Sequence, residues 1–185
     1  MSTTGRLVIL DRDGTINRDS PSYIRSASEF EALPGSLEAI ARFNQAGWRV
    51  AIATNQSGLG RGYFTISDLH DMHKRLHREL AAVGGSIDGI FFCPHTPQDG
   101  CQCRKPKPGL LLEVARRFGS ALAGVPVIGD SQRDLQAAQA VGARPILVRT
   151  GNGSDAESQL NAAGDEVETY DTLAAAVDAI LSADD

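Results

Sequence analysis

The chain has 185 residues, of which 42% are hydrophobic and 22% charged, and this composition predicts a globular protein of one domain. Its net charge of −5 argues against a general binder of nucleic acid or of anionic membranes. Residues 1–5 lack an apolar signal core, no apolar run is long enough to span a bilayer, and all 3 cysteines lie between positions 93 and 103. We therefore expect a cytoplasmic protein with reduced thiols.

Apolar runs bounded by turn residues predict strands, and apolar residues at helical spacing predict helices between them. The expected strands cover residues 7–10, 50–53, 90–92, 125–128 and 145–148, and the expected helices cover residues 35–46, 65–83, 109–118, 131–141 and 172–181. This alternation predicts a doubly wound parallel α/β sheet of Rossmann type within a single domain, 1–185. Residues 16–33 form a long polar loop after the first strand, residues 154–166 have only a weak pattern, and residues 183–185 are expected to fray.

Two carboxylates follow the first strand directly, at Asp11 and Asp13. Residues two apart in an extended chain point the same way, so both side chains are expected at one spot past the carboxyl end of the strand, with Arg12 pointing elsewhere. Open α/β sheets bind their ligands in that crevice. Two neighbouring carboxylates also raise each other's pKa unless a cation neutralises them. The pair therefore suggests a nucleophile and an acid/base beside a Mg²⁺ site. A polar turn after a strand remains the simpler alternative.

Polar residues also follow later strands of the expected sheet. Residues 54–58 combine a hydroxyl, amides and a glycine, as a phosphate-binding loop does. Asp130 ends the fourth strand and is suited either to complete an oxygen shell for Mg²⁺ or to cap the next helix. Asp134 either supports the same site or favours the helix N-terminus. The carboxyl ends of parallel strands share one edge, so we expect these groups to face one pocket.

The segment 93–103 carries Cys93, His95, Cys101 and Cys103. Three thiolates and an imidazole suit a closed tetrahedral zinc site, which would be structural and would hold together a loop without a core of its own. A strained disulfide between Cys101 and Cys103, three free thiols, or a nucleic-acid-binding zinc ribbon are the alternatives. His73 and His77, four residues apart beside the apolar stripe of helix 65–83, are suited to share a metal, although polar residues normally flank such a stripe.

Taken in order, the motifs resemble the signature motifs of haloacid-dehalogenase-type phosphohydrolases. They are Asp11-x-Asp13-Gly14-Thr15, Thr54-Asn55-Gln56, Lys105 and Gly129-Asp130. The resemblance covers about residues 6–150 and implies a fold without a large cap domain, in which loops and the zinc segment screen the site. It also implies a Mg²⁺-dependent phosphomonoesterase that works through an aspartyl phosphate.

The resemblance also implies a role for each matching residue. Asp11 is the nucleophile, Asp13 the general acid and base, and Mg²⁺ is held by Asp11, the backbone carbonyl of Asp13, and Asp130. Thr54 and Lys105 hold the phosphoryl group. Residues expected to bind the rest of the substrate are Asp19, Ser20, Pro21, Ser22, Asn55, Gln56, Ser57, Arg61, Arg104 and Ser131.

Within that family the chain is similar to two groups, the phosphatases of heptose bisphosphates in lipopolysaccharide precursor synthesis and the histidinol-phosphate phosphatases. Residues 57–64 and 149–151 resemble the heptose group. The short spacing from His95 to Cys101 resembles the histidinol group, and Ser131 stands where heptose phosphatases often carry a lysine.

A sugar bisphosphate carries a second dianion and so requires further cations. Arg61 and Arg104 are expected to supply them, Arg149 is a weaker choice, and Arg133 is placed to replace the missing lysine. The resemblance to the heptose group implies removal of the 7-phosphate of a heptose 1,7-bisphosphate. We also expect a monomer that binds neither nucleic acid nor membranes. A histidinol-phosphate phosphatase and a catalytically silent zinc-binding interaction module remain the alternatives.

Overall fold

The computed structural model describes residues 6–183. The expectations for residues 1–5 and 184–185 lie outside this range, and Ala183 is the last residue of the final helix. Six strands are present: β1 (Leu7–Leu10), β2 (Arg49–Asn55), β3 (Gly89–Cys93), β4 (Pro126–Gly129), β5 (Arg144–Val148) and β6 (Glu168–Tyr170). The α-helices are α1 (Ser36–Gln45), α2 (Ser57–Gly60), α3 (Ile66–Ala82), α4 (Gly109–Phe118), α5 (Gln132–Ala140), α6 (Gly153–Ala163) and α7 (Leu173–Ala183), with short 3-10 turns η1 (Ala27–Glu29) and η2 (Pro97–Asp99).

Every strand and helix predicted from the sequence is present, with ends that differ by at most one or two residues. Local chemistry explains several of these ends. At α3, the Thr65 hydroxyl accepts from the Asp68 amide and the Asp68 carboxylate accepts from the Thr65 amide, which is a capping box. At α4, Gly119 adopts the left-handed conformation that stops the helix.

The prediction missed α2, α6 and β6. Residues 154–166 have little apolar periodicity because α6 is mostly exposed, with only Gly153 and Ala156 buried. The three residues of β6 are half-buried at the edge of the sheet, so they lack the apolar run of a central strand. These elements form through contacts with the rest of the fold, which their own sequence patterns do not show.

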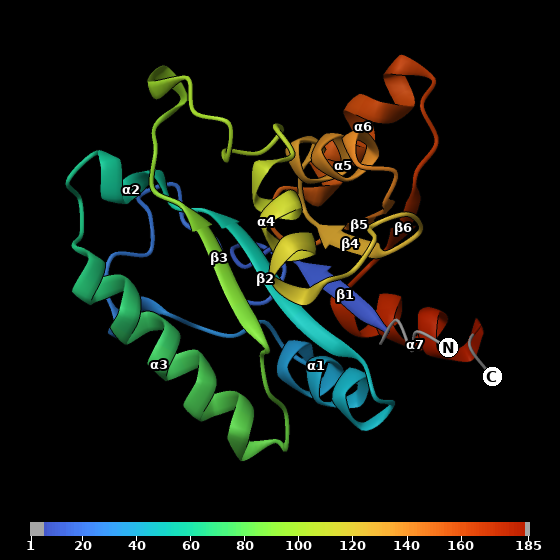
Figure 1. Ribbon diagram of the computed structural model, residues 1–185, viewed down its shortest axis with the longest axis horizontal. Helices are drawn as coiled ribbons and strands as arrows, with labels where there is room; N and C mark the ends of the chain where they lie inside the picture. The colour runs from blue at the N-terminus through green and yellow to red at the C-terminus, as the bar shows by residue number, and fades with distance from the viewer. Residues whose placement is uncertain (1–5, 184–185) are drawn as a thin grey trace.

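All six strands are parallel and lie in the order β3-β2-β1-β4-β5-β6 (Figure 1). The chain therefore moves outward from β1 in one direction, then returns to β4 and moves outward in the other. The point where this direction reverses lies between β1 and β4, where Leu10 is in register with Ile128. Sheets of this kind bind ligands outside the carboxyl ends of the strands at that point.

Both faces of the sheet are covered, as the doubly wound prediction requires. Along β1, Val8 and Leu10 belong to the core under α1, α3 and α7, whereas Leu7 and Ile9 belong to the core under α4 and α5. This alternation follows from the two-residue period of a strand. Between residues 6 and 183 there is no separate cap domain, and none of the helices has the length and hydrophobicity needed to cross a membrane.

Candidate active site

A pocket of about 230 Å³ lies at the carboxyl edge of the sheet, across the point where the strand order reverses. Asp11 follows β1 directly, and its backbone amide donates to the carbonyl of Ile128 in β4 (2.9 Å), so the first carboxylate is fixed between two strands. The residues that line this pocket are Asp11, Asp13, Asp19, Ser20, Tyr23, Ile24, Thr54, Asn55, Gln56, Ser57, Arg104, Lys105, Asp130, Ser131, Arg133, Asp134 and Asn152. Most of the residues that the sequence singled out therefore share one cavity.

Lys105 is a buried lining residue of this pocket and joins two carboxylates. Its Nζ donates to Asp11 Oδ1 (2.9 Å), to Asp134 Oδ1 (2.5 Å) and to the carbonyl of Ala53 (2.6 Å). Burial by itself lowers the pKa of a lysine, but the charges of Asp11 and Asp134 outweigh it and raise the pKa of Lys105, so the ammonium stays protonated. The side chain of Asn55 holds the backbone of Lys105 from both sides, donating to its carbonyl and accepting from its amide, each at 3.1 Å.

Asp11, Asp130 and Asp134 form an acidic cluster whose oxygens lie within 4.8 Å of one another. Burial, followed by the charge of Asp134, raises the pKa of Asp11 well above its ordinary value and that of Asp130 to about 6. One lysine is therefore not enough to neutralise three crowded carboxylates. Oxygen ligands at this spacing and an excess of negative charge both fit a Mg²⁺ ion.

Asp134 enters this cluster through the cap of α5. Its Oδ2 accepts from the hydroxyl (2.6 Å) and the amide (3.1 Å) of Ser131, so Ser131 is the N-cap residue and the alternative role of Asp130 as the helix cap is wrong. Asp130 instead accepts from the amide of Asn152 (2.8 Å). Asn152 belongs to the loop after β5 and was not predicted as a site residue, although its position just past the carboxyl end of a strand is the sequence signal that could have identified it.

Two glycines permit the backbone to approach Asp130 closely. A Cβ at Gly14 would lie 2.0 Å from Asp130 Oδ2, and a Cβ at Gly151 would lie 2.2 Å from the same atom. Both glycines also have positive φ, +83° and +57°, which side chains disfavour. These two positions therefore need glycine for the sake of the carboxylate.

The Asp13 carboxylate lies in the pocket wall but outside the acidic cluster. It accepts from Asn17 Nδ2 (2.9 Å), from Gln56 Nε2 (2.8 Å) and from the guanidinium of Arg12. Burial by itself raises the pKa of this carboxyl, but the Arg12 charge and these hydrogen bonds hold it below its ordinary value. The expectation that Arg12 points elsewhere is wrong in one respect: its side chain is not a lining residue, yet its guanidinium returns to Asp13.

The two aspartates consequently differ in proton affinity, as separate roles require. The same Gln56 amide that holds Asp13 also donates to Thr54 Oγ1 (2.9 Å), which connects the end of β2 to the loop after β1.

The loop 16–33 lies over the pocket as predicted, through Asp19, Ser20, Tyr23 and Ile24. Pro21 and Ser22, in the same loop, line adjoining hollows instead. Among the cations proposed for a second phosphate, the structure brings Arg104 and Arg133 into the pocket.

Two further arginines singled out by the sequence lie elsewhere. Arg61 is exposed and is absent from the lining residues described. Arg149, the weaker choice, is an ion-pair partner of Glu157 and Asp171 (2.6 and 2.8 Å) and is not among the lining residues described.

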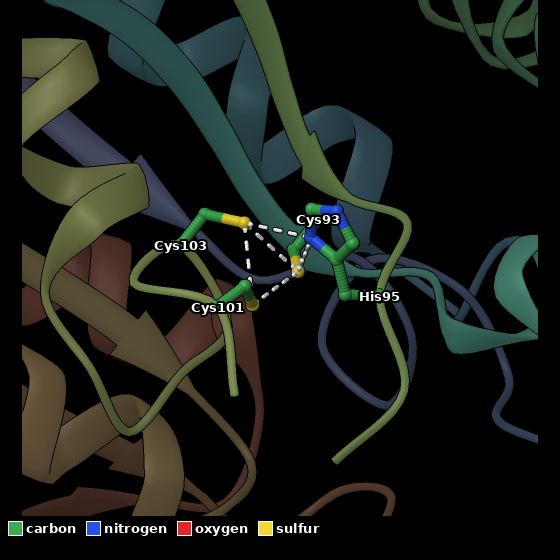
Figure 2. Close-up of side chains that lie close together, drawn as sticks. All are labelled: Cys93, His95, Cys101 and Cys103. Atoms are coloured by element: carbon green, nitrogen blue, oxygen red, sulfur yellow. Dashed lines mark hydrogen bonds between the residues drawn. The ribbon is translucent and has the colours of Figure 1, made fainter. Parts of the chain in front are cut away.

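The four residues proposed as zinc ligands converge on one point (Figure 2). The sulfurs of Cys93, Cys101 and Cys103 are separated by 3.1–3.7 Å, and His95 Nδ1 lies 3.6 Å from Cys93 Sγ and 3.3 Å from Cys103 Sγ. All three cysteines are free, so the disulfide alternative is wrong. These separations approach the edges of a tetrahedron of thiolate and imidazole ligands around one Zn²⁺.

The position of this cluster connects it to the pocket. Cys93 ends β3, and Cys103 is followed directly by Arg104 and Lys105. Within residues 6–183, no group of three or more His, Cys, Asp or Glu ligands includes His73 and His77, so the suggested pair lacks a third ligand. His73 Nε2 lies 3.5 Å from Arg12 Nη1 instead.

Comparison with known proteins agrees with this geometry. Residues 102–176 match the HAD-hydrolase-like family model. The chain is 57% identical to D-glycero-β-D-manno-heptose-1,7-bisphosphate 7-phosphatase of Bordetella bronchiseptica over 80% of its own length and 83% of the relative. It is 49% identical to the protein of the same name from Pseudomonas aeruginosa over 95% of its own length and 97% of the relative.

A solved structure is similar as well. The D,D-heptose 1,7-bisphosphate phosphatase of B. bronchiseptica, complexed with magnesium and phosphate, superposes with a TM-score of 0.92 at 50% identity and covers 96% of this chain and 99% of its own. Together with the aspartate pair, the buried lysine and the strand order, these likenesses show that the chain belongs to the HAD-like phosphatases, in the family of the D-glycero-D-manno-heptose-1,7-bisphosphate 7-phosphatases.

Proposed function

We propose that this chain is a magnesium-dependent phosphatase that removes the 7-phosphate of D-glycero-β-D-manno-heptose 1,7-bisphosphate. The observation that carries the proposal is Asp11, which is held by Lys105 where the strand order reverses, in a pocket that also contains Asp13 and Asp130. The sugar and its anomer come from the names of relatives that are 57% and 49% identical to the chain.

The first half of the reaction is attack by Asp11 on phosphorus. Lys105 directs the carboxylate through its 2.9 Å hydrogen bond, and the P–O bond to the sugar breaks as the new bond to Asp11 Oδ forms, leaving an aspartyl phosphate. Thr54 lines the pocket beside Asp11 and Lys105, where its hydroxyl is suited to contact a phosphoryl oxygen. Mg²⁺, held by Asp11, Asp130 and the backbone carbonyl of Asp13, would neutralise the charge that these carboxylates and the phosphate concentrate here.

Asp13 transfers protons in both halves of the reaction. It protonates the departing sugar oxygen, and it then takes a proton from the water that hydrolyses the aspartyl phosphate and releases inorganic phosphate. In the free protein the pKa of Asp13 is lowered, chiefly by the Arg12 charge acting against burial. A phosphate dianion bound beside it raises its proton affinity, so the group becomes an acid when substrate is present.

The remaining lining residues are suited to select the sugar. Asp19 and Ser20 come from the loop after β1, Ser57 from the start of α2, and Arg104 from the zinc segment. Arg104 and Arg133 line the pocket together, and after burial the Arg133 charge is the largest cause that lowers the pKa of Arg104. Two cations this close favour an anionic group between them, which suits the second phosphate of a bisphosphate.

We also propose one structural Zn²⁺ held by Cys93, His95, Cys101 and Cys103. Four protein ligands leave no open position for substrate. Burial, followed by the hydrogen bond to Cys103, raises the pKa of Cys93 to about 12, so this buried sulfur needs a cation before it can be a thiolate. The thiols must also stay reduced, as they do in the cytoplasm, where we place the enzyme. We also propose that the enzyme is active as a monomer.

The decisive experiment compares phosphate release from both anomers of heptose 1,7-bisphosphate and from histidinol phosphate in one Mg²⁺ buffer. We expect the β anomer to have the highest kcat/KM. Asp11→Asn, which is nearly isosteric, is expected to lower kcat by roughly 10⁴-fold or more because the nucleophile is lost. Better hydrolysis of histidinol phosphate would overturn the substrate, and an active Asp11→Asn enzyme would overturn the nucleophile. Release that needs Asp11 excludes a silent zinc-binding module.

A further inference from the structure

Arg12 is a fully buried charge beside the active site. Its exposed fraction is 0%, and it does not line the pocket described above. A buried guanidinium without partners costs several kcal/mol. The buried charge of Arg12 must therefore be stabilised by the groups that surround it.

One side of the guanidinium holds the Asp13 carboxylate as a fork. Arg12 Nε donates to Oδ1 (3.0 Å), and Nη2 donates to both Oδ1 (2.8 Å) and Oδ2 (3.1 Å). Asn17 Nδ2 adds a further donor to Oδ1 (2.9 Å), while Gln56 Nε2 donates to Oδ2 (2.8 Å). Oδ1 is therefore the anchored oxygen, with three donors, and Oδ2 is the less constrained one. Two-point contacts of this kind fix the plane of a carboxylate as well as its position.

The other side of the guanidinium is supported by α3. Arg12 Nη1 lies 3.5 Å from His73 Nε2 and 4.0 Å from Met72 Sδ. Burial, followed by the Arg12 charge, lowers the pKa of His73 to about 3. The imidazole is therefore neutral at pH 7, and its Nε2 is suited to accept a hydrogen bond from Arg12. This contact gives the buried His73 a role that the metal interpretation did not.

We propose that Arg12, supported by His73, is a positioning residue for proton transfer: it anchors Oδ1 of Asp13 so that Oδ2 faces the bound phosphate ester. The inference rests on the proposed function, because it assigns Asp13 as the acid and base. Arg12 itself does not touch the substrate. In this way α3, which contributes no lining residue to the pocket, affects the first chemical step.

The test separates proton transfer from folding by changing the leaving group. An alkyl phosphate needs a proton on its departing oxygen, whereas p-nitrophenyl phosphate releases a stable phenolate and does not. We would measure the rate of alcohol release in the first turnover, with enzyme in excess, for heptose bisphosphate and for p-nitrophenyl phosphate. The variants are Arg12→Met and His73→Leu, and His77→Leu is the matched control, because His77 is exposed on the same helix.

We expect Arg12→Met to lower the first-turnover rate on the sugar phosphate by about 10²–10³-fold, as loss of general acid catalysis does, and to lower that on p-nitrophenyl phosphate less than tenfold. His73→Leu is expected to give the same pattern with a smaller loss, about 5- to 10-fold, at nearly unchanged KM. His77→Leu is expected to behave as wild type.

Equal losses on both substrates would overturn the positioning role, because a general disturbance of the pocket slows both reactions alike. An unchanged rate on the sugar phosphate would overturn it as well. If Arg12→Met does not fold, as judged by circular dichroism, His73→Leu decides by the same comparison. Activity of the wild type separates this proposal from the proposed function. If the wild type prefers another alkyl phosphate, the proposed substrate is wrong, and the comparison of variants is repeated on that ester. If the wild type has no phosphatase activity, both proposals are wrong.

Discussion

Replacement of Lys105 by methionine tests whether one buried ammonium maintains the whole acidic cluster. The substitution retains most of the apolar stem and removes the charge. The Lys105 side chain is 4% exposed, and its partners Asp11 and Asp134 are 13% and 2% exposed. Both carboxylates therefore lose their counter-charge in a place where water can compensate only in part, least of all at Asp134.

The expected loss of stability follows from that burial. Removing one partner of a buried ion pair costs about 3–5 kcal/mol, because the other charge stays behind unpaired. A protein of this size loses about 2–4 °C of Tm per kcal/mol, so Tm is expected to fall by about 6–20 °C in Mg²⁺-free buffer. Loss of the Lys105 ammonium also favours binding of a metal ion by the acidic cluster, so Mg²⁺ is expected to raise Tm more in the variant than in the wild type. The rate is expected to fall by about 10²–10³-fold because a phosphoryl contact is lost.

Thermal unfolding at pH 7.5, with and without added Mg²⁺, and kcat on heptose bisphosphate measure these effects. Lys74→Met is the matched control, since Lys74 is 77% exposed and pairs with Asp71 on the surface of α3; such pairs contribute about 0–1 kcal/mol. If Lys105→Met loses no more stability than Lys74→Met and keeps its kcat within tenfold, Lys105 does not maintain the cluster and the reasoning is wrong.

Two other perturbations probe the metal sites. Protein purified without chelator is expected to contain one zinc per chain by elemental analysis. Cys101→Ser is expected to lose zinc and activity together because the segment carrying Arg104 loosens. A zinc-free wild type or a fully active variant would contradict this. In metal-free protein, burial raises the pKa of Asp11 and that of Asp130 to about 6. The folded state then binds more protons than the unfolded state between about pH 4 and 6, so its free energy of unfolding falls as pH rises through that window. Mg²⁺ is therefore expected to raise Tm more at pH 7.5 than at pH 5, and an equal gain at both would count against this cluster as its site.

Local sequence determined the parts of this protein in which chemistry and pattern coincide along the chain. An apolar run cut off by Asp11 is sufficient to mark β1, since an extended buried segment must end where charge begins. Four ligands within eleven residues, Cys93 to Cys103, converge in the fold because the loop that joins them is short. The motif order then placed Lys105 and Asp130 at the same rim as Asp11, because parallel strands share one carboxyl edge.

The tertiary structure alone decided how charges far apart in the sequence pair. Lys105 meets Asp134 across 29 positions, and Arg12 meets His73 across 61. Arg149 faces Glu157 and Asp171 instead of the pocket. Which of several arginines finds a carboxylate depends on the distances that the folded sheet and helices impose, and no local pattern contains those distances. For the same reason α6 and β6 became visible only in the fold, because their order comes from packing against β5 rather than from a periodic apolar face of their own.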